Sequence, residues 1–306
     1  MPKGVPKGTS LRVASVLLLG PLIWGVGFVA TKATLAGSGP LWANGFRFLF
    51  AIVILSPFAA RAVSRLPKHH LVSGIWLGVF LLGAFSFQTA GMVATTVAHA
   101  SFITGLYAVF VPLLGPLFGR RPRPWQVAAV ALAVVGLILL TGLAASDARV
   151  SRGDWLILGC AVVSAFHILL ADRVAKDVDP IALNWVQLAT VAVLSLVAAR
   201  LVEGPMAIRW LPQVIVSQLY LAIFSSGVAF TLQFWAQRRI SPTAAAMVFL
   251  LEAPFGALAG YLVYGERLTA LQGLGGLLMM GASYLAVAAG DERTPAEGIA
   301  LRETGV

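Results

Sequence analysis

The sequence has little charge: only 11% of its 306 residues are charged, whereas 59% are hydrophobic. A soluble domain carries about 25% charged residues to cover its surface. The mean hydropathy of +0.89 agrees with this deficit. These values exclude a soluble globular protein and indicate an integral membrane protein. Because the apolar runs are long and continuous rather than short and alternating, we expect an all-α protein.

Cysteine and catalytic motifs are also scarce. The single cysteine, Cys160, cannot form an intramolecular disulfide, and one Cys with four scattered His residues offers no metal site. The sequence contains no Walker-type phosphate loop, no HExxH and no Gly-x-Ser-x-Gly. We therefore expect no metal, no cofactor and no ATP-driven activity of this chain alone. A membrane-embedded enzyme becomes the weak alternative.

Ten apolar segments are present, each long enough to cross a bilayer core of about 30 Å as a helix. Short links rich in Gly, Pro and charge separate them, and the longest central break, at 144–153, divides five segments from five. The predicted spans are 11–35, 40–60, 71–92, 98–118, 123–143, 154–172, 180–199, 212–236, 242–264 and 268–289.

The net charge of +10 reflects topology rather than nucleic-acid binding, because Lys and Arg gather in the short links. With the N-terminus inside, 15 of the 22 Lys and Arg fall in inside segments, 6 in outside segments and Arg47 within a span. The positive-inside rule then predicts that both termini are cytoplasmic. The N-terminal apolar run is too long for a signal-peptide core, so we expect an uncleaved first span.

The two halves of the chain resemble each other. A slide of 140 residues pairs Pro40 with Pro180 and Asn44 with Asn184, and a slide of 146 pairs GRRPRPWQ at 119 with GERLTALQ at 265. Five spans are an odd number, so the second copy would be inverted in the membrane. This predicts one repeat at 1–146, an inverted repeat at 147–290 and a cytoplasmic, disordered tail at 291–306.

Three stretches carry a family resemblance: WGVGF at 24, PLWANGFRF at 40 and EAPFGALAGYLVYGERLT at 252. With the ten spans and the repeat, the chain resembles the EamA-type drug/metabolite transporter (DMT) superfamily over nearly its whole length. The resemblance implies a secondary transporter, often an exporter of small metabolites such as amino acids, that works by alternating access. It also implies that spans 1, 3, 4, 6, 8 and 9 line a central cavity, with spans 5 and 10 at the periphery.

Two charges lie at unexpected depth. Glu252 falls near the middle of span 9, where an ionised group costs at least about 2.5–3.5 kcal/mol, so it must face protein or water. It is either a proton-coupling or cation-binding carboxylate or a structural acid. Arg47 lies about seven residues into span 2. It either binds an anionic group or snorkels, or it pairs with a carbonyl or with Glu252.

Proline and glycine interrupt spans 4 and 9 at roughly corresponding places. Pro112 lies in span 4, and Pro254 and Gly256 lie in span 9. A proline frees backbone carbonyls that a cavity can use, and matched interruptions in two halves point to a transport site. Close helix packing through small residues is the simpler interpretation.

Polar and aromatic side chains at mid-span depth are the candidates for binding a small amphipathic molecule. For each residue alone, a packing role competes with a binding role. His167 is also the second candidate for carrying a proton. The predicted substrate-binding residues are Trp24, Phe28, Gln88, Tyr107, His167, Gln233 and Trp235.

The sequence thus predicts a secondary active transporter of the inner membrane that moves an amino acid or similar amphipathic compound. Export by alternating access is expected, with protons as the coupling ion. A passive channel or facilitator is the alternative, since channels also use helices lined with polar residues. Expected partners are the small-molecule substrate and the lipid bilayer, with no nucleic acid, and the chain would act as a monomer or homodimer.

Overall fold

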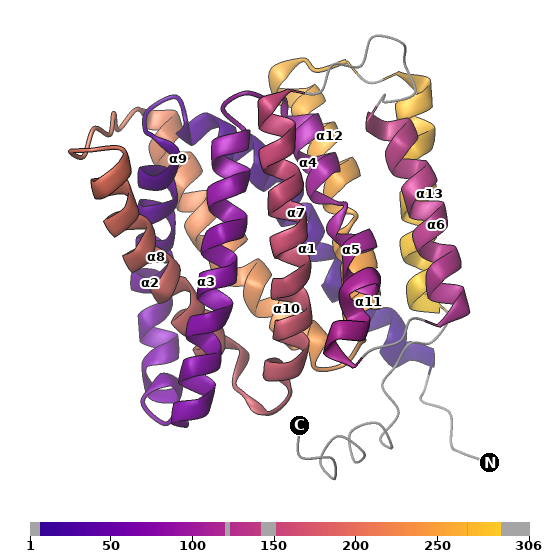
Figure 1. The fold of residues 1–306 in the computed structure, drawn as a ribbon, viewed down its shortest axis with the longest axis horizontal. Coiled ribbons are helices and arrows are strands. Elements are labelled where there is room, and N and C mark those ends of the chain that lie inside the picture. Colours follow the sequence, from indigo (N-terminus) through magenta and orange to yellow (C-terminus); the bar gives the residue numbers. More distant parts are fainter. Residues whose placement is uncertain (1–6, 120–122, 142–150, 268, 289–306) are drawn as a thin grey trace.

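The computed structural model describes residues 7–119, 123–141, 151–267 and 269–288, and every regular element within these ranges is a helix (Figure 1). The predicted tail at 291–306 lies outside the described residues. The first half contains α1 (Lys7–Thr34), α2 (Pro40–Val63), α3 (Lys68–Gly91), α4 (Val97–Thr104), α5 (Tyr107–Leu114), η1 (Gly115–Phe118) and α6 (Pro124–Thr141).

The second half repeats this order of elements. It contains α7 (Arg152–Val174), η2 (Ala175–Asp177), α8 (Pro180–Val202), α9 (Pro212–Tyr220), the π-helix η3 (Leu221–Ala229), α10 (Phe230–Gln237), α11 (Pro242–Phe249), α12 (Glu252–Tyr264) and α13 (Ala270–Ala288). The all-α prediction is therefore confirmed.

Seven helical stretches of the described chain are long and apolar enough to cross a membrane. They correspond to the predicted spans 2, 3, 4, 6, 7, 8 and 9. Three shorter apolar helices, Leu18–Thr34, Pro124–Leu139 and Ala270–Leu285, stand where spans 1, 5 and 10 were predicted. Seven of the ten predicted spans are thus found at full spanning length, and the other three remain predictions.

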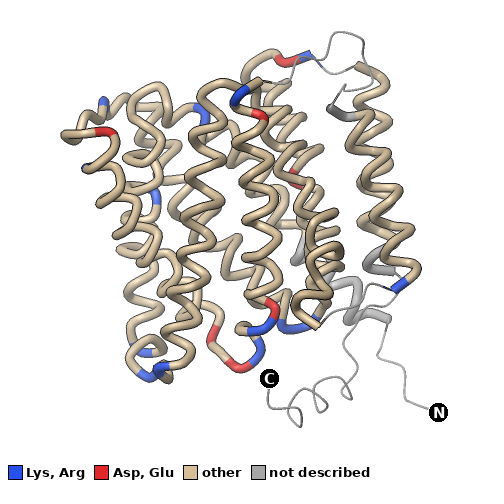
Figure 2. Tube along the Cα trace, viewed as in Figure 1, with Lys and Arg blue, Asp and Glu red and all other residues tan. Residues whose placement is uncertain are grey.

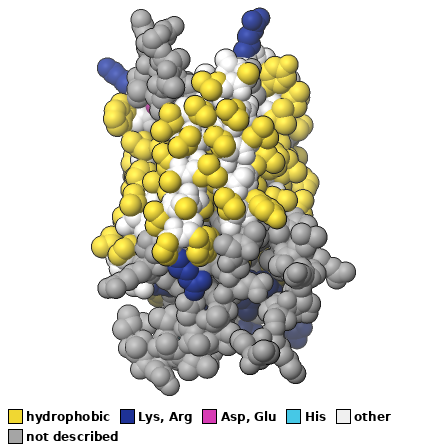
Figure 3. All heavy atoms as spheres, turned by 90° about the vertical axis from the view of Figure 1, so that its right-hand side faces the viewer, with side chains coloured by type: hydrophobic (Ala, Val, Ile, Leu, Met, Phe, Trp, Pro, Cys, Tyr) yellow, Lys and Arg dark blue, Asp and Glu magenta, His cyan; other side chains and the backbone are white. Residues whose placement is uncertain are grey.

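The outer surface suits lipid. Large apolar side chains such as Phe58, Leu117 and Leu262 are about 70% exposed. Charged residues gather at the two ends of the helices (Figure 2). On the face formed by α6 and α13, an apolar band lies between these two charged ends (Figure 3). A soluble protein would bury these side chains, so the exposed apolar belt identifies the surface that contacts the bilayer.

Helices that correspond in the two halves pack against each other. α2 lies against α8 at one edge and α6 against α13 at the other (Figure 1). Between these edges, α3 of span 3 packs against α7 of span 6, and the equivalent pair is α1 of span 1 with α9 and η3 of span 8. Pro40 and Pro180 each begin their helix, where a proline costs no hydrogen bond. This pairing is the arrangement expected of two inverted repeats, with the cavity between them.

The paired asparagines have corresponding partners. Asn44 Nδ2 donates to the Phe85 carbonyl on α3, 3.1 Å away. Asn184 Nδ2 donates to the carbonyls of Ser226 and Gly227 on η3, at 3.0 and 3.1 Å. In each half, the second span is thus tied to the third by the same residue type. These bonds support the repeat that the sequence pattern predicts.

Gly119 and Gly265 also correspond between the halves. Both adopt left-handed backbone conformations, with φ of 69° and 67°, directly after η1 and α12. Glycine adopts this conformation without the strain that a Cβ would add. After Gly265, the Glu266 carboxylate accepts hydrogen bonds from the N–H groups of Val97 and Ala98 at the start of α4, each 3.0 Å long. The loop between α12 and α13 is thereby attached to α4.

Candidate functional site

A cavity lies between the two halves, with an empty volume of about 650 Å³ that includes the solvent space at its opening. Its walls come from α1, α3, α4, α5, α7, η3, α10, α11 and α12, which are the spans that the family resemblance assigns to the cavity. Arg47 from α2 is an addition to that set. α6 and α13 contribute no lining residue in the described chain.

Two helix breaks place the polar groups of the cavity. α4 ends at Thr104 and α5 begins at Tyr107, while α11 ends at Phe249 and α12 begins at Glu252. The slide of 146 residues brings these breaks together, so they occupy corresponding positions in the two halves. Pro254 removes a backbone donor near the start of α12, so the carbonyl of Leu250 at the break receives no helical bond from it. Each break therefore turns a polar side chain toward the cavity.

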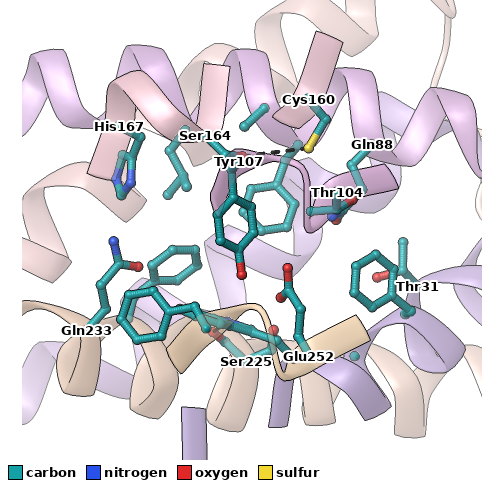
Figure 4. Close-up of a pocket in the computed structure, with 18 of the residues that line it drawn as sticks. Thr31, Gln88, Thr104, Tyr107, Cys160, Ser164, His167, Ser225, Gln233 and Glu252 are labelled. Atoms are coloured by element: carbon teal, nitrogen blue, oxygen red, sulfur yellow. Dashed lines mark hydrogen bonds between the residues drawn. The ribbon is translucent and has the colours of Figure 1, made fainter. Parts of the chain in front are cut away.

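Among the polar atoms that line the cavity, three oxygens have no hydrogen-bond partner in the described chain. Thr104 Oγ1, Tyr107 Oη and Glu252 Oε1 are buried and make no hydrogen bond within the described chain. Figure 4 shows the Tyr107 hydroxyl and the Glu252 carboxyl pointing toward each other across the cavity. Buried polar atoms nearly always make a hydrogen bond, and a buried polar atom without one costs about 1–3 kcal/mol of stability. Three such atoms facing one cavity indicate a ligand-binding site.

Aromatic rings form the apolar walls. Trp24 has its ring centroid 5.2 Å from that of Phe230 and 5.2 Å from that of Phe249. Its indole Nε1–H donates to the Ser225 carbonyl at 3.1 Å, which fixes the ring against the π-helix η3. Phe85 continues the wall, 6.0 Å from Phe230. These rings can hold the apolar part of an amphipathic molecule.

His167 and Gln233 lie toward one end of the cavity, and Thr31 and Gln88 lie toward the other (Figure 4). His167 Nε2 is 2.9 Å from Gln187 Oε1, and Gln187 Nε2 in turn donates to Asn184 Oδ1. The imidazole therefore belongs to a hydrogen-bonded network between α7 and α8, which favours a positioning role over a proton-carrying one.

Arg47 is buried but lines the cavity. Its Nε–H donates to Ser226 Oγ at 2.9 Å and an Nη2–H donates to Ser225 Oγ at 2.8 Å. Within the described chain, the hydrogen-bond partners of this side chain are these two hydroxyls rather than Glu252 or a carbonyl. Whether Arg47 binds an anionic group stays a prediction.

Six of the seven predicted binding residues line the cavity, and Trp235 does not. Trp235 packs against the cluster of Ala236 and Val248, and the Arg239 guanidinium carbon lies 3.9 Å from the centre of its ring. Trp235 lies two positions after Gln233, so the two side chains point to different faces of α10. Trp235 thus lies outside this cavity, and its role in substrate binding stays a prediction.

The residues named as helix breaks lie beside the breaks rather than in them. Pro112 lies inside α5, and Pro254 and Gly256 lie in the first turns of α12. A Cβ on Gly256 would come within 2.6 Å of Ser101 Cβ, so this glycine allows α12 to approach α4 closely. The sequence pattern also missed several small or aromatic lining residues, which are Thr31, Phe85, Thr104, Cys160, Ser164, Ser225, Phe230 and Phe249.

Within the described chain, no group of three or more His, Cys, Asp or Glu side chains is placed to hold a metal ion. The cavity's one carboxylate among the described lining residues is Glu252. The chemistry of the site is therefore that of hydrogen bonding, charge and aromatic contact.

Comparison with known proteins gives the same assignment as the architecture. The model of the EamA-like transporter family matches the chain twice, over residues 11–142 and 151–288. The chain belongs to this family. The two matches fall on the two halves that the sequence repeat delimits, although the predicted bounds at 146 and 290 stay predictions.

Relatives of this EamA-like transporter are similar to most of its length. An "Uncharacterized transporter" of Archaeoglobus fulgidus is 30% identical over 269 residues, which cover 86% of this chain and 82% of the relative. The "Uncharacterized inner membrane transporter YedA" of Escherichia coli K12 is 27% identical and covers 83% of each chain. A "Probable amino-acid metabolite efflux pump" of the same strain is also 27% identical, over 88% of this chain and 93% of the relative.

A protein of known crystal structure shares the fold. Its TM-score is 0.71 at 20% sequence identity, and the match covers 90% of this chain and 96% of that one. The family match and the names of the relatives point to a membrane transporter.

Proposed function

We propose that this EamA-like transporter is a secondary active exporter of an amino acid or a similar small amphipathic compound. It works by alternating access and exchanges the substrate for a proton at Glu252. It resides in the inner membrane with both termini in the cytoplasm.

The observation that carries this proposal is the set of three unpartnered oxygens in the cavity, on Thr104, Tyr107 and Glu252. They offer acceptors to a group that brings its own N–H or O–H donors, such as an ammonium group. Two elements that begin at helix breaks provide Tyr107 and Glu252, so movement at the breaks changes the distance between them. Binding and conformational change are thereby linked in one place.

The aromatic walls support a substrate with an apolar portion. Trp24 contacts both Phe230 and Phe249 at the cavity, where ring faces bind apolar or cationic groups. The relative named as an amino-acid metabolite efflux pump agrees with a compound that has both a charged and an apolar part.

Proton exchange is supported by the depth and surroundings of Glu252. Its side chain is buried, and the hydrogen bonds of the described chain leave Oε1 without a donor. A carboxylate at this depth is costly and marks ion pathways and proton relays in membrane proteins. The Glu252 carboxylate is neutralised by a proton in one direction and by a substrate cation in the other. Only a transporter with this carboxylate neutralised then changes between its inward-open and outward-open conformations.

Counterflow distinguishes this carrier from a channel. Purified protein in liposomes is loaded with a mixture of the proteinogenic amino acids and diluted into trace labelled amino acids, one per assay. We expect at least one labelled amino acid to accumulate transiently above its equilibrium level. A carrier that exports an unlabelled amino acid brings a labelled one back into the liposome when its site reorients. Downhill flux without accumulation would indicate a channel, and no flux of any amino acid would reject the proposed substrate class.

A further inference from the structure

The cavity contains a second charge that the proposed mechanism does not use. Arg47 belongs to α2, whose other side chains pack outside the cavity, and it reaches the lining between α3 and η3. Only 2% of its surface is exposed. A guanidinium remains protonated in proteins, so this side chain brings a permanent positive charge to the cavity.

The groups around this charge are neutral. Two serine hydroxyls accept hydrogen bonds from Arg47, and the rings of Phe85 and Phe48 lie 4.3 and 5.0 Å from its central carbon. No Asp or Glu oxygen of the described chain lies within 4.0 Å of it. A buried cation without a counter-charge is strongly unfavourable, so the position calls for an anion from elsewhere.

The guanidinium also has unused donors. Its two hydrogen bonds use two of its five N–H groups, and no other hydrogen bond of this side chain is found within the described ranges. Ser225, which accepts the hydrogen bond from Arg47 Nη2, itself lines the cavity, whereas Ser226 does not. Arg binds carboxylates with two parallel N–H···O bonds, and a serine hydroxyl can add a third donor.

The geometry points to a carboxylate subsite formed by Arg47 and Ser225. The substrate is then a zwitterion: its carboxylate binds at Arg47, its ammonium group binds at the oxygens of Thr104, Tyr107 and Glu252, and its apolar side chain lies against the aromatic wall. This assignment rests on the proposed function, because it describes the substrate of the same cavity.

A purely architectural role for Arg47 makes a different prediction. In that case the guanidinium only fixes η3, through Ser225 and Ser226 alike. The affinity for a ligand would then not depend on whether the ligand carries a carboxylate, and the two serines would be equally important.

Matched ligands test the subsite. The full-length protein in detergent is titrated with L-leucine, L-methionine and L-phenylalanine and with the amide of each, and Kd is obtained from the ligand-dependent rise in Tm. At least one acid is expected to bind roughly 10- to 100-fold more tightly than its amide, the range of a hydrogen bond to a charged group. Equal affinity within every pair, or no binding by either member of every pair, overturns the proposal.

Variants locate the effect. Arg47→Gln should bring the acid-to-amide ratio close to one, and Arg47→Lys should restore part of it. Because Arg47 variants can fail to fold, Ser225→Ala is the second test, with the neighbouring Ser226→Ala as its matched control. The ratio should fall several-fold with Ser225→Ala and clearly less with Ser226→Ala, because only Ser225 both holds Arg47 and faces the ligand. A ratio that Ser225→Ala leaves unchanged, or lowers no more than Ser226→Ala does, would overturn the subsite formed by Arg47 and Ser225.

The binding assay is independent of transport. A preserved acid-to-amide preference without counterflow would reject the proposed function and leave the carboxylate subsite standing. Counterflow together with equal affinity for acid and amide would support the proposed function and reject the carboxylate subsite.

Discussion

Glu252→Gln should abolish pH-driven transport and leave the protein folded. Glutamine has nearly the same shape and can still hydrogen-bond, but it cannot release or take up a proton. In liposomes with an imposed pH gradient, flux through the variant should fall to the level of protein-free liposomes. The Tm should stay the same or rise, because the variant no longer buries an ionisable group.

Glu266→Gln is the matched control. Glu266 caps α4 and lies outside the cavity lining, so its loss should reduce stability by about 1 kcal/mol and leave the pH dependence of transport intact. If Glu252→Gln retains pH-dependent flux, the coupling role is wrong. If this variant fails to fold while Glu266→Gln folds, Glu252 is a structural acid.

Gly25→Ala should destabilise the protein strongly. A Cβ at this position would lie 2.5 Å from Phe255 Cβ and 2.8 Å from the Gly256 nitrogen, so α1 would have to move away from α12. Backbone atoms cannot give way as a flexible side chain can, and overpacking of this kind costs about 1–3 kcal/mol or more. The Tm of the purified variant should fall by several degrees, and its yield should drop.

Gly20→Ala is the control for this substitution. It lies on the same helix, and apart from that helix's own nearby backbone no atom of the described residues lies within 4 Å of the Cβ that alanine would add. Its Tm should match or exceed that of the wild type, because alanine favours a helix more than glycine does. Equal behaviour of the two variants would contradict the close contact between α1 and α12.

The sequence predicted the architecture because membrane helices must satisfy their own backbone hydrogen bonds and face lipid. The all-α fold follows from the apolar runs, and landmarks such as Pro40 with Pro180 and Gly119 with Gly265 revealed the repeat. Glu252 was identified for the same reason, since a charge in an apolar run is conspicuous. In the first half, Leu106 corresponds to Glu252. Only one of the two helix breaks therefore carries a carboxylate.

The details of the cavity could not be predicted, because they depend on which face of each helix points inward. Trp235 and Gln233 are both polar or aromatic residues at mid-span depth, and only packing separates them. The π-helix η3 changes the helical register within span 8, and its residues leave no signature in the hydropathy pattern. Thr104, Ser164 and Ser225 are small polar residues of a kind that also occurs at packing interfaces, so their role emerges only from their convergence.

The claim that the central cavity is the substrate path can be tested at Cys160, the one cysteine of the sequence. Its side chain lines the cavity, with Sγ 3.7 Å from Ser164 Oγ (Figure 4). Because this thiol is buried and reacts slowly, N-ethylmaleimide labelling in proteoliposomes is quantified by mass spectrometry, with and without a transported amino acid. Transport by the labelled protein is then compared with that of Cys160→Ala. We predict that labelling stops transport, that the amino acid slows labelling, and that Cys160→Ala transports normally and resists the reagent. Full transport by the labelled wild-type protein would contradict the account.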